Sequence, residues 1–346
     1  MRSKTVLYAI IAACLACWSG LVRLSLPYPS FGTVQTIPSQ KLPTPSALTG
    51  PYAPNEVLKD VTKLFKGKLQ GTESVHVSEG GTLWLPDKYG NVFTAEPDSG
   101  GEYSVVRKVA YLGPSRPLGH TMDADGNLLV ADSAKGLIML ERATGKVVIL
   151  ASQVSADSPK DPGSVINYAN DLDIAHDGTV YFTTSSDIPV VPNALGVWDT
   201  FAVFTLTMLQ GSITGRLLSY SPKTQATHVL ADGFWYANGV AVAQDQSFVA
   251  VAETVTMTVH KYWLNGPKRG QTEVMIDSLP GFPDGVSLAE DGNFWITLVA
   301  PNQPFVKVLP YRLPRFIFAW LPKLGVKPKT KQFGMVIKVW HETVGS

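Results

Sequence analysis

The sequence predicts an all-β fold of the propeller class, and three observations support this. First, 30 Gly and 25 Pro among 346 residues indicate many tight turns between short elements. Second, five segments share one pattern, in which an alternating apolar strand, a tight turn and a second strand rich in β-branched or aromatic residues follow one another. Third, further strand-like runs follow some of these hairpins, giving about four strands per unit at a spacing of roughly 45–70 residues.

Each predicted hairpin is centred on two turn residues. The turns are Gly80-Gly81, Asp125-Gly126, Asp177-Gly178, Asp245-Gln246 and Asp291-Gly292, within residues 74–85, 121–130, 172–183, 240–252 and 286–297. Additional strands are expected at residues 136–140, 146–150, 216–220, 227–230, 260–264 and 273–276. After the last hairpin, the sequence offers one more strand, at residues 334–340.

The N-terminal region differs in composition from the repeats. Arg2 and Lys4 precede an apolar run over residues 5–22, which is about long enough to cross a bilayer as a helix. Basic residues before such a run favour a cytoplasmic N-terminus, so we expect a single-pass membrane protein with its C-terminal body on the non-cytoplasmic side. Residues 11–14 also resemble a lipoprotein processing site, which leaves a secreted or periplasmic product open.

The composition therefore divides the chain into three predicted domains. These are a signal anchor at 1–26, a Pro-rich linker at 27–56 and a β-propeller at 57–346. The 29 basic and 28 acidic residues give a net charge of +1, which provides no electrostatic footprint for nucleic acid. Both cysteines, Cys14 and Cys17, precede the propeller, so its body has no thiol for a disulfide, a zinc site or a nucleophile.

One position per unit stands seven residues before the first turn residue. Four of these five positions carry a side-chain oxygen, namely Glu73, Asn170, Asn238 and Asp284, whereas the second unit has Leu118. The first strand of each propeller blade lines the central channel, so equivalent positions are expected to converge there. Two carboxylates and two amides, without sulfur or imidazole, suit Ca²⁺ better than zinc or copper. A single Asn or Asp at the start of a strand is more often a turn residue. The site is predicted because these residues occupy equivalent positions in four units.

A cation at this position would polarise a substrate carbonyl or phosphoryl oxygen. Asp284 and His120 are the candidate catalytic residues, which would activate water or attack the substrate. His120 is chosen because it lies two residues beyond Leu118, on the same predicted face of its strand. A lone His on an inner strand is more often a packing residue. Residues 234–236 (Phe-Trp-Tyr) are expected either in an aromatic wall beside Asn238 or in the core between blades.

Two long insertions separate the second and third strands of the third and fifth units, at residues 187–214 and 301–333. The second contains seven Lys or Arg and no acidic residue. Because strands alternate in direction, both loops are expected on the face that holds the metal positions. Neither apolar run can span a bilayer, so a substrate lid, a surface in the lipid interface, and simple packing on the propeller all remain open.

Several short motifs extend over residues 50–340. They include residues 71–74 (Gly-Thr-Glu-Ser), 116–119 (Arg-Pro-Leu-Gly), 130–137, 214–218 (Thr-Gly-Arg-Leu-Leu), 261–267 and 279–285 (Leu-Pro-Gly-Phe-Pro-Asp-Gly). This set resembles the strictosidine-synthase-like family, in the branch of the adipocyte plasma-membrane-associated proteins. The resemblance implies a six-bladed propeller with one N-terminal anchor and its body outside the cytosol.

The wider superfamily includes calcium-dependent paraoxonases, gluconolactonases and phosphotriesterase-like enzymes. Their calcium ligands are a Glu, two Asn and an Asp on successive inner strands, which match Glu73, Asn170, Asn238 and Asp284. Two departures stand out. The chain stops roughly 45–60 residues short of a closed sixth blade, for which residues 57–69 could supply only the outermost strand. The last-blade glutamate that strictosidine synthase employs has no counterpart here.

The sequence therefore favours a membrane-anchored, Ca²⁺-dependent hydrolase of small apolar esters or lactones. A propeller with structural Ca²⁺ that binds a lipid or protein partner without turnover is the alternative. Condensation of an amine with an aldehyde, which strictosidine synthase performs, is the least favoured.

Overall fold

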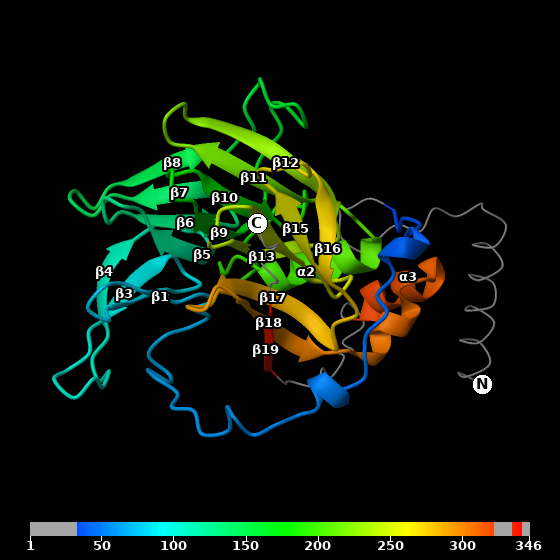
Figure 1. The fold of residues 1–346 in the computed structure, drawn as a ribbon, viewed down its shortest axis with the longest axis horizontal. Coiled ribbons are helices and arrows are strands. Elements are labelled where there is room, and N and C mark those ends of the chain that lie inside the picture. The colour runs from blue at the N-terminus through cyan, green and yellow to red at the C-terminus, as the bar shows by residue number, and fades with distance from the viewer. Residues whose placement is uncertain (1–32, 322–333, 341–346) are drawn as a thin grey trace.

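The computed structural model describes residues 33–321 and 334–340, which form a propeller of antiparallel sheets (Figure 1). The predicted signal anchor and the first part of the predicted linker lie outside the described residues. In the described ranges, no helix has the length and apolar character needed to cross a membrane.

Five sheets follow one another along the chain, and their strands are arranged in chain order. The first contains β1 (His76–Val77), β2 (Leu83–Pro86), β3 (Asn91–Ala95) and β4 (Arg107–Tyr111). The second contains β5 (Pro117–Met122), β6 (Leu128–Asp132), β7 (Gly136–Leu140) and β8 (Val147–Ala151). The third contains β9 (Ala169–Ile174), β10 (Val180–Thr184), β11 (Gly215–Ser221) and β12 (Ala226–Phe234). The fourth contains β13 (Ala237–Val242), β14 (Phe248–Glu253), β15 (Thr258–Trp263) and β16 (Thr272–Ile276), and the fifth β17 (Gly281–Leu288), β18 (Phe294–Pro301) and β19 (Met335–Val339).

The predicted all-β propeller and its five hairpins are confirmed. The first strands of successive sheets contact one another in the order β1, β5, β9, β13 and β17, so they form the inner ring (Figure 1). Apolar side chains between the sheets make up the core, and every residue of β14 is buried.

The described residues form five sheets, which differs from the six implied by the resemblance. Residues 57–69 form turns and no strand, so the expected outermost strand of a sixth sheet is absent from them. Phe65 of this segment shares an apolar cluster with Leu83 and Leu85 of β2, so the segment contacts the first sheet through a side chain and adds no strand to it. Val77 of the first sheet and Trp295 and Val336 of the fifth are exposed.

Both predicted insertions contain helices. α2 (Thr200–Gln210) begins after Asp199, whose carboxylate accepts a hydrogen bond from the Ala202 N–H at 3.0 Å, and ends at Gly211, which has a left-handed φ of 77°. In the second insertion, the 3₁₀ helix η3 (Pro304–Val308) precedes α3 (Arg312–Trp320). The helices α2 and α3 pack together beside the propeller (Figure 1).

The described part of the predicted linker packs on the propeller. It contains two short 3₁₀ helices, η1 (Ser39–Lys41) and η2 (Gly50–Tyr52), and Val34 is fully buried. The ammonium group of Lys41 lies 2.6 Å from a carboxylate oxygen of Glu253, a residue at the end of β14 whose side chain is 1% exposed. This contact fastens the linker to the fourth sheet.

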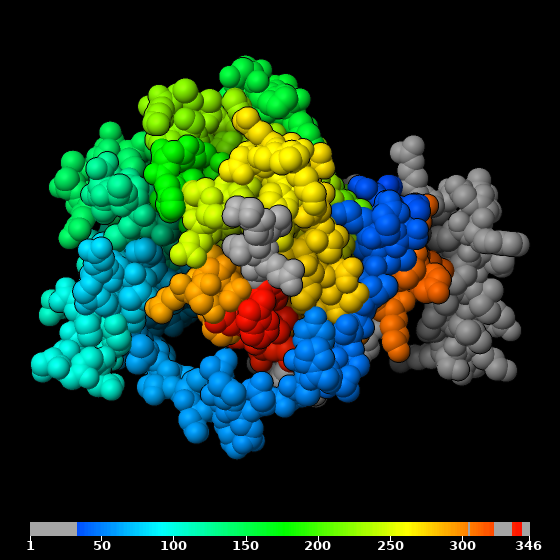
Figure 2. Space-filling view, in the orientation of Figure 1, coloured from blue at the N-terminus to red at the C-terminus, as the bar shows by residue number. Residues whose placement is uncertain are grey.

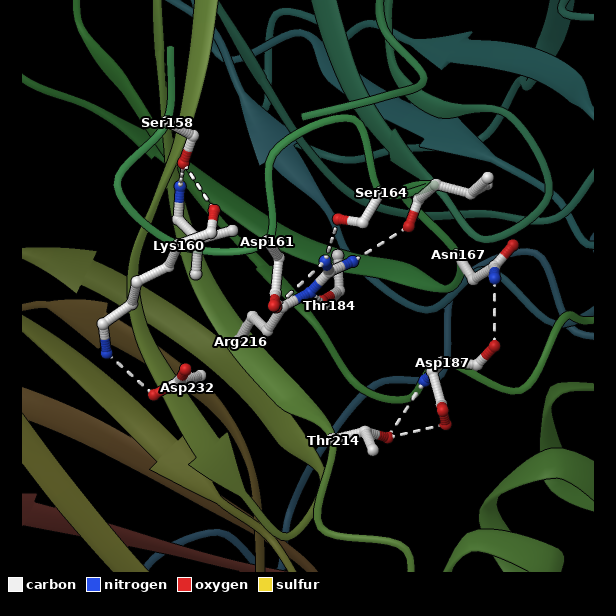
Figure 3. Close-up of polar contacts among 12 residues, drawn as sticks. Ser158, Lys160, Asp161, Ser164, Asn167, Thr184, Asp187, Thr214, Arg216 and Asp232 are labelled. Atoms are coloured by element: carbon white, nitrogen blue, oxygen red, sulfur yellow. Dashed lines mark hydrogen bonds and ion pairs between the residues drawn. The ribbon is translucent and has the colours of Figure 1, made fainter. Parts of the chain in front are cut away.

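A buried arginine holds the loop that leads into the third sheet (Figure 3). Arg216 donates hydrogen bonds to Thr184 at 3.2 Å, to the Ser164 hydroxyl at 2.8 Å and to the Val165 carbonyl at 3.0 Å. Figure 3 also shows Asp187 joined to Thr214 at the two ends of the first insertion, with 2.8 Å between the carboxylate and the hydroxyl. These contacts fix the chain on both sides of the strand that carries Asn170.

Candidate metal centre in the channel

The inner strands of four sheets share one irregularity at the predicted channel positions. In each, two residues of the first strand face one residue of the second strand, which is a β-bulge. The bulged pairs are Leu118-Gly119, Asn170-Asp171, Asn238-Gly239 and Asp284-Gly285. The four positions are therefore structurally equivalent, and the bulge turns each first residue away from the regular alternation of its strand.

Glycine at the second bulge position lets neighbouring inner strands approach closely. A Cβ atom on Gly239 would lie less than 3.0 Å from backbone atoms of Asp284 and Val286. A Cβ atom on Gly119 would meet Asp171 of the next sheet equally closely. The close approach of β13 to β17 brings the side chains of Asn238 and Asp284 together.

The two asparagines are held by their amide nitrogens. The Asn238 amide donates to the Asp284 carboxylate at 2.6 Å and to the Thr254 hydroxyl at 3.1 Å. The Asn170 amide donates to the Ser185 hydroxyl at 2.7 Å. Asn170 is 4% exposed, and its carbonyl oxygen is buried without a hydrogen-bond partner among the described residues. Such an oxygen is costly unless a ligand contacts it.

Negative charge accumulates beside the asparagines. Burial raises the pKa of Glu73 well above its ordinary value, and the charges of Asp284 and Asp171 raise it further, while Arg116 opposes them. Glu73 lies just before β1 and is reached by solvent, although protein surrounds it closely. Burial also raises the pKa of Asp284, against the lowering effect of its hydrogen bond from Asn238. The carboxylates thus repel one another in a confined space, which a cation would relieve.

The donor set fits Ca²⁺. All four predicted ligands are oxygen donors, and the buried Asn170 oxygen lacks another partner among the described residues. Within residues 33–321 and 334–340, no three His, Cys, Asp or Glu side chains are arranged to hold a metal by themselves. A metal at this point would accordingly need the amide oxygens of Asn170 and Asn238, and Ca²⁺ accepts such ligands readily.

Sequence reasoning missed Asp171, which occupies the position that is glycine in the other three bulges. Its carboxylate accepts hydrogen bonds from the N–H groups of Leu172 at 2.9 Å and Val240 at 3.0 Å, so it ties β9 to β13. Burial raises the pKa of Asp171 to about 7, and Asp173 and Asp284 add to the effect. The sequence could have indicated it, because Asp171 directly follows Asn170 where the other three bulged strands have glycine.

His120 is buried between the first and second sheets. The bulge at Leu118-Gly119 breaks the alternation that would have put Leu118 and His120 on one face. The two ring nitrogens lie 3.3 Å from the Leu118 carbonyl and 3.0 Å from the Trp84 carbonyl in the first sheet. Burial lowers the pKa of His120 to about 4. These contacts are those of a packing residue between two sheets.

An aromatic layer covers the channel positions. Tyr168, Tyr236 and Phe282 each stand two residues before a channel position, and the Tyr236 hydroxyl donates to that of Tyr168. Phe204 of α2 packs 5.0 Å from Tyr236 and 6.5 Å from Phe282, measured between ring centroids. Phe305 of η3 stacks on Phe282 at 5.9 Å. Both insertions therefore lie at the end of the channel that holds the predicted ligands.

The three aromatic residues before Asn238 have different environments. Trp235 is fully buried and its indole N–H donates to the Thr207 carbonyl at 3.3 Å, while Phe234 packs against His260 in the core. Of the three, Tyr236 joins the aromatic layer. Tyr168 and Tyr236 have positive φ angles of 48° and 72°, a conformation that costs about 1–3 kcal/mol for such residues and is concentrated at functional sites.

The five sheets and their inner ring of first strands define a class, that of β-propellers. Residues 170–267 match the family model for strictosidine synthase. This match and the two relatives described next confirm the resemblance to strictosidine-synthase-like proteins.

Named relatives agree with this assignment. The chain is 37% identical over 209 residues to strictosidine synthase-like 13 of Arabidopsis thaliana, covering 58% of this chain and 47% of that protein. It is 27% identical over 330 residues to the adipocyte plasma membrane-associated protein of Gallus gallus, covering 88% and 75%. The match thus spans about half the length of the first relative and three quarters of the second.

One solved structure shares the architecture. A gluconolactonase from Xanthomonas campestris superposes with a TM-score of 0.51 at 18% identity, covering 67% of this chain and 71% of that chain. At this identity the likeness establishes the propeller fold alone.

Proposed function

We propose that this protein is a Ca²⁺-dependent hydrolase of small apolar esters or lactones, anchored in a membrane by residues 1–26 with its propeller on the non-cytoplasmic side. The observation that supports it best is the set of side-chain oxygens at the equivalent bulged positions of the inner strands. There the Asn170 carbonyl oxygen is buried without a described partner, and Asn238 bonds directly to Asp284. The aromatic layer beside these donors suits an apolar substrate.

The residues have separate roles in this proposal. Glu73, Asn170, Asn238 and Asp284 would hold the ion. Bound Ca²⁺ would polarise the carbonyl of the ester or lactone. Asp284, oriented by the Asn238 amide, is our candidate acceptor for the proton of the attacking water. We favour Asp284 over His120, because both His120 nitrogens face backbone carbonyls. Asp171 would keep β9 and β13, and with them the two asparagines, in register.

Chelation tests the catalytic proposal. The purified protein is assayed with phenyl acetate and with a δ-lactone before and after EGTA treatment. We expect loss of turnover and its recovery with added Ca²⁺. Asp284→Asn should lower turnover on the order of 10²-fold or more, since it removes a ligand and the proton acceptor. The matched control is Asp125→Asn, at an exposed hairpin turn. Turnover that survives both EGTA and Asp284→Asn would rule the mechanism out.

A second candidate is a propeller with structural Ca²⁺ that binds a lipid or protein partner without turnover. The close aromatic cover favours it, because Phe204 and Phe305 pack directly on Tyr236 and Phe282 over the candidate ligands. Full Ca²⁺ occupancy without turnover on a panel of esters, lactones and phosphotriesters would select this function.

Membrane topology is tested separately. Protease that reaches only the cytoplasmic face of the membrane should leave a C-terminal epitope tag intact. Protease that reaches the opposite face should digest the tag. The protein should also stay in the membrane pellet after alkaline carbonate extraction. Release into the supernatant would contradict an uncleaved anchor.

A further inference from the structure

The two insertions leave several large apolar side chains exposed, before and at the start of α2 and along α3. On the first insertion, Leu195 is 86% exposed and Phe201 is 68% exposed. On the second insertion, Tyr311, Ile317 and Trp320 are exposed. The residues of α2 include no charged side chain. Most of α2 is buried, but Phe201 at its start and the exposed face of α3 present apolar side chains where a surface helix normally presents polar ones.

Charge distinguishes the possible partners of this surface. Residues 301–333 contain seven Lys or Arg and no Asp or Glu. Among the described ones, Lys307 and Arg312 are exposed next to the apolar residues of α3. Aromatic and aliphatic side chains beside basic ones match the composition of helices that lie in the interface of an anionic bilayer.

The chain before the propeller is tied to the same helices. The Arg312 side chain donates to the Val34 carbonyl at 3.0 Å, the Gln35 N–H donates to the Gln210 carbonyl at 2.7 Å, and Arg315 donates to the Gln35 carbonyl. Residues 34–35 are thus held against α2 and α3. Eleven residues lie between Val34 and the end of the apolar run 5–22, and a chain of this length spans about 40 Å at most. An anchor in a bilayer would keep both helices within reach of that bilayer.

We propose that the exposed side chains before and at the start of α2, together with the exposed face of α3, lie in the interface of an anionic bilayer. Leu195, Phe201, Ile317 and Trp320 enter the lipid, and Lys307 and Arg312 contact its head groups. The inner face of α2 covers the channel through Phe204, so this helix separates the lipid from the candidate site. It follows that the substrates are lipid-soluble esters that enter from the bilayer past α2, an extension that rests on the proposed function.

Site-specific labels test the surface directly. Cys14 and Cys17 are the only two cysteines, so the full chain with Cys14→Ser and Cys17→Ser can carry one new cysteine, labelled with the environment-sensitive dye NBD. The test positions are Phe201→Cys and Ile317→Cys. The controls are Ile149→Cys in β8 and Val109→Cys in β4, which are 57% and 51% exposed. The labelled proteins are reconstituted into vesicles of phosphatidylcholine and phosphatidylserine.

We expect NBD emission at positions 201 and 317 to rise at least twofold in these vesicles and to be quenched by brominated lipids. Labels at positions 149 and 109 should respond to neither. Removing phosphatidylserine should weaken the response at 201 and 317. Emission at these two positions that matches the controls would overturn the proposal and leave a protein partner as the occupant of the surface.

A second assay links the surface to the substrate. Phe201→Ser/Ile317→Ser should slow hydrolysis of a long-chain ester in vesicles about tenfold, because the surface no longer seats in the lipid. Hydrolysis of dissolved phenyl acetate should not change, and Ile149→Ser serves as the control. Equal loss with both esters would overturn lipid entry. If the wild type hydrolyses neither ester, the proposed function fails, while the labels still decide whether the surface contacts lipid.

Discussion

At the level of single residues, hydrogen bonds decide what the channel can bind. The amide nitrogens of Asn170 and Asn238 are engaged by Ser185, Thr254 and Asp284, and the Asn170 oxygen is left for a ligand. Residue spacing predicted these two positions because equivalent positions in a repeat share a place in space. It could not predict the hydrogen-bond partners, which come from other strands.

His120 provides a test at this scale. Burial lowers its pKa from 6.5 to about 4, so the unfolded chain takes up a proton near the higher value and the folded protein only near the lower one. Stability therefore falls as the pH drops between these values, by about 3 kcal/mol. His120→Gln, which cannot be protonated, should show a shallower loss in urea unfolding across this range.

The same variant separates the two roles considered for this residue. If His120 has a packing role, the variant should show near-normal turnover at neutral pH and a smaller loss of folding stability at acidic pH. A hundredfold loss of turnover, with the pH dependence of stability unchanged, would instead support the catalytic role.

At the level of elements, the hairpins follow from period-two alternation and turn residues, whereas the bulges do not. An alternating pattern does not reveal the extra residue of a bulge. It therefore predicted Leu118 and His120 on one strand face, whereas the bulge at Leu118-Gly119 interrupts the alternation between them. Residues 57–69 illustrate the other limit, since they were expected to supply a strand but form turns, and Phe65 contacts the first sheet through its side chain alone. Local pattern specifies a hairpin, while tertiary pairing decides whether a lone segment becomes a strand.

The bulge glycines can be tested by one added methyl group. Gly239→Ala should destabilise the protein by about 1–3 kcal/mol and weaken Ca²⁺ binding, because its Cβ meets backbone atoms of Asp284 and Val286 that cannot move independently. Gly334→Ala, where a Cβ meets no atom within 4 Å, is the matched control. Urea unfolding measures both variants, and equal stability of the two would refute the close approach.

The contact between the linker and β14 predicts an acid-sensitive attachment. Glu253 accepts hydrogen bonds from Lys41 and from the Trp235 N–H, each at 2.6 Å, and lies 2.7 Å from the His260 ring. Burial alone would raise the pKa of Glu253, but His260 and Lys41 outweigh it and lower the pKa. The stabilisation is thus present above the ordinary carboxylate pKa and is lost as the pH falls through the lowered value.

Glu253→Gln should cost about 3–5 kcal/mol, because it leaves Lys41 and His260 without their buried carboxylate. Limited proteolysis should then cut within residues 33–53 faster than in the wild type. Glu273→Gln, in an exposed ion pair with Lys268, is the control. Unchanged stability together with unchanged proteolysis would mean that other contacts hold the linker.

At the level of the whole molecule, repetition made the fold predictable. Five copies of a hairpin specified a propeller, and three of the predicted ligands, Asn170, Asn238 and Asp284, lie at equivalent bulges of its inner strands. The sheet number implied by resemblance was less secure, since the described residues form five sheets. The direction of the strands predicted that both insertions lie at the ligand end of the channel. Because the insertions follow no repeat, their packing through Phe204 and Phe305 could not be predicted.

The central claim is that Glu73, Asn170, Asn238 and Asp284 grip one divalent ion. Isothermal titration calorimetry of the chelator-treated full chain with CaCl₂ tests it most directly, alongside the variant Glu73→Gln/Asp284→Asn. We predict saturable binding at a single site in the wild type and none in the variant. Absence of binding at millimolar Ca²⁺, or equal binding by both proteins, would contradict the claim.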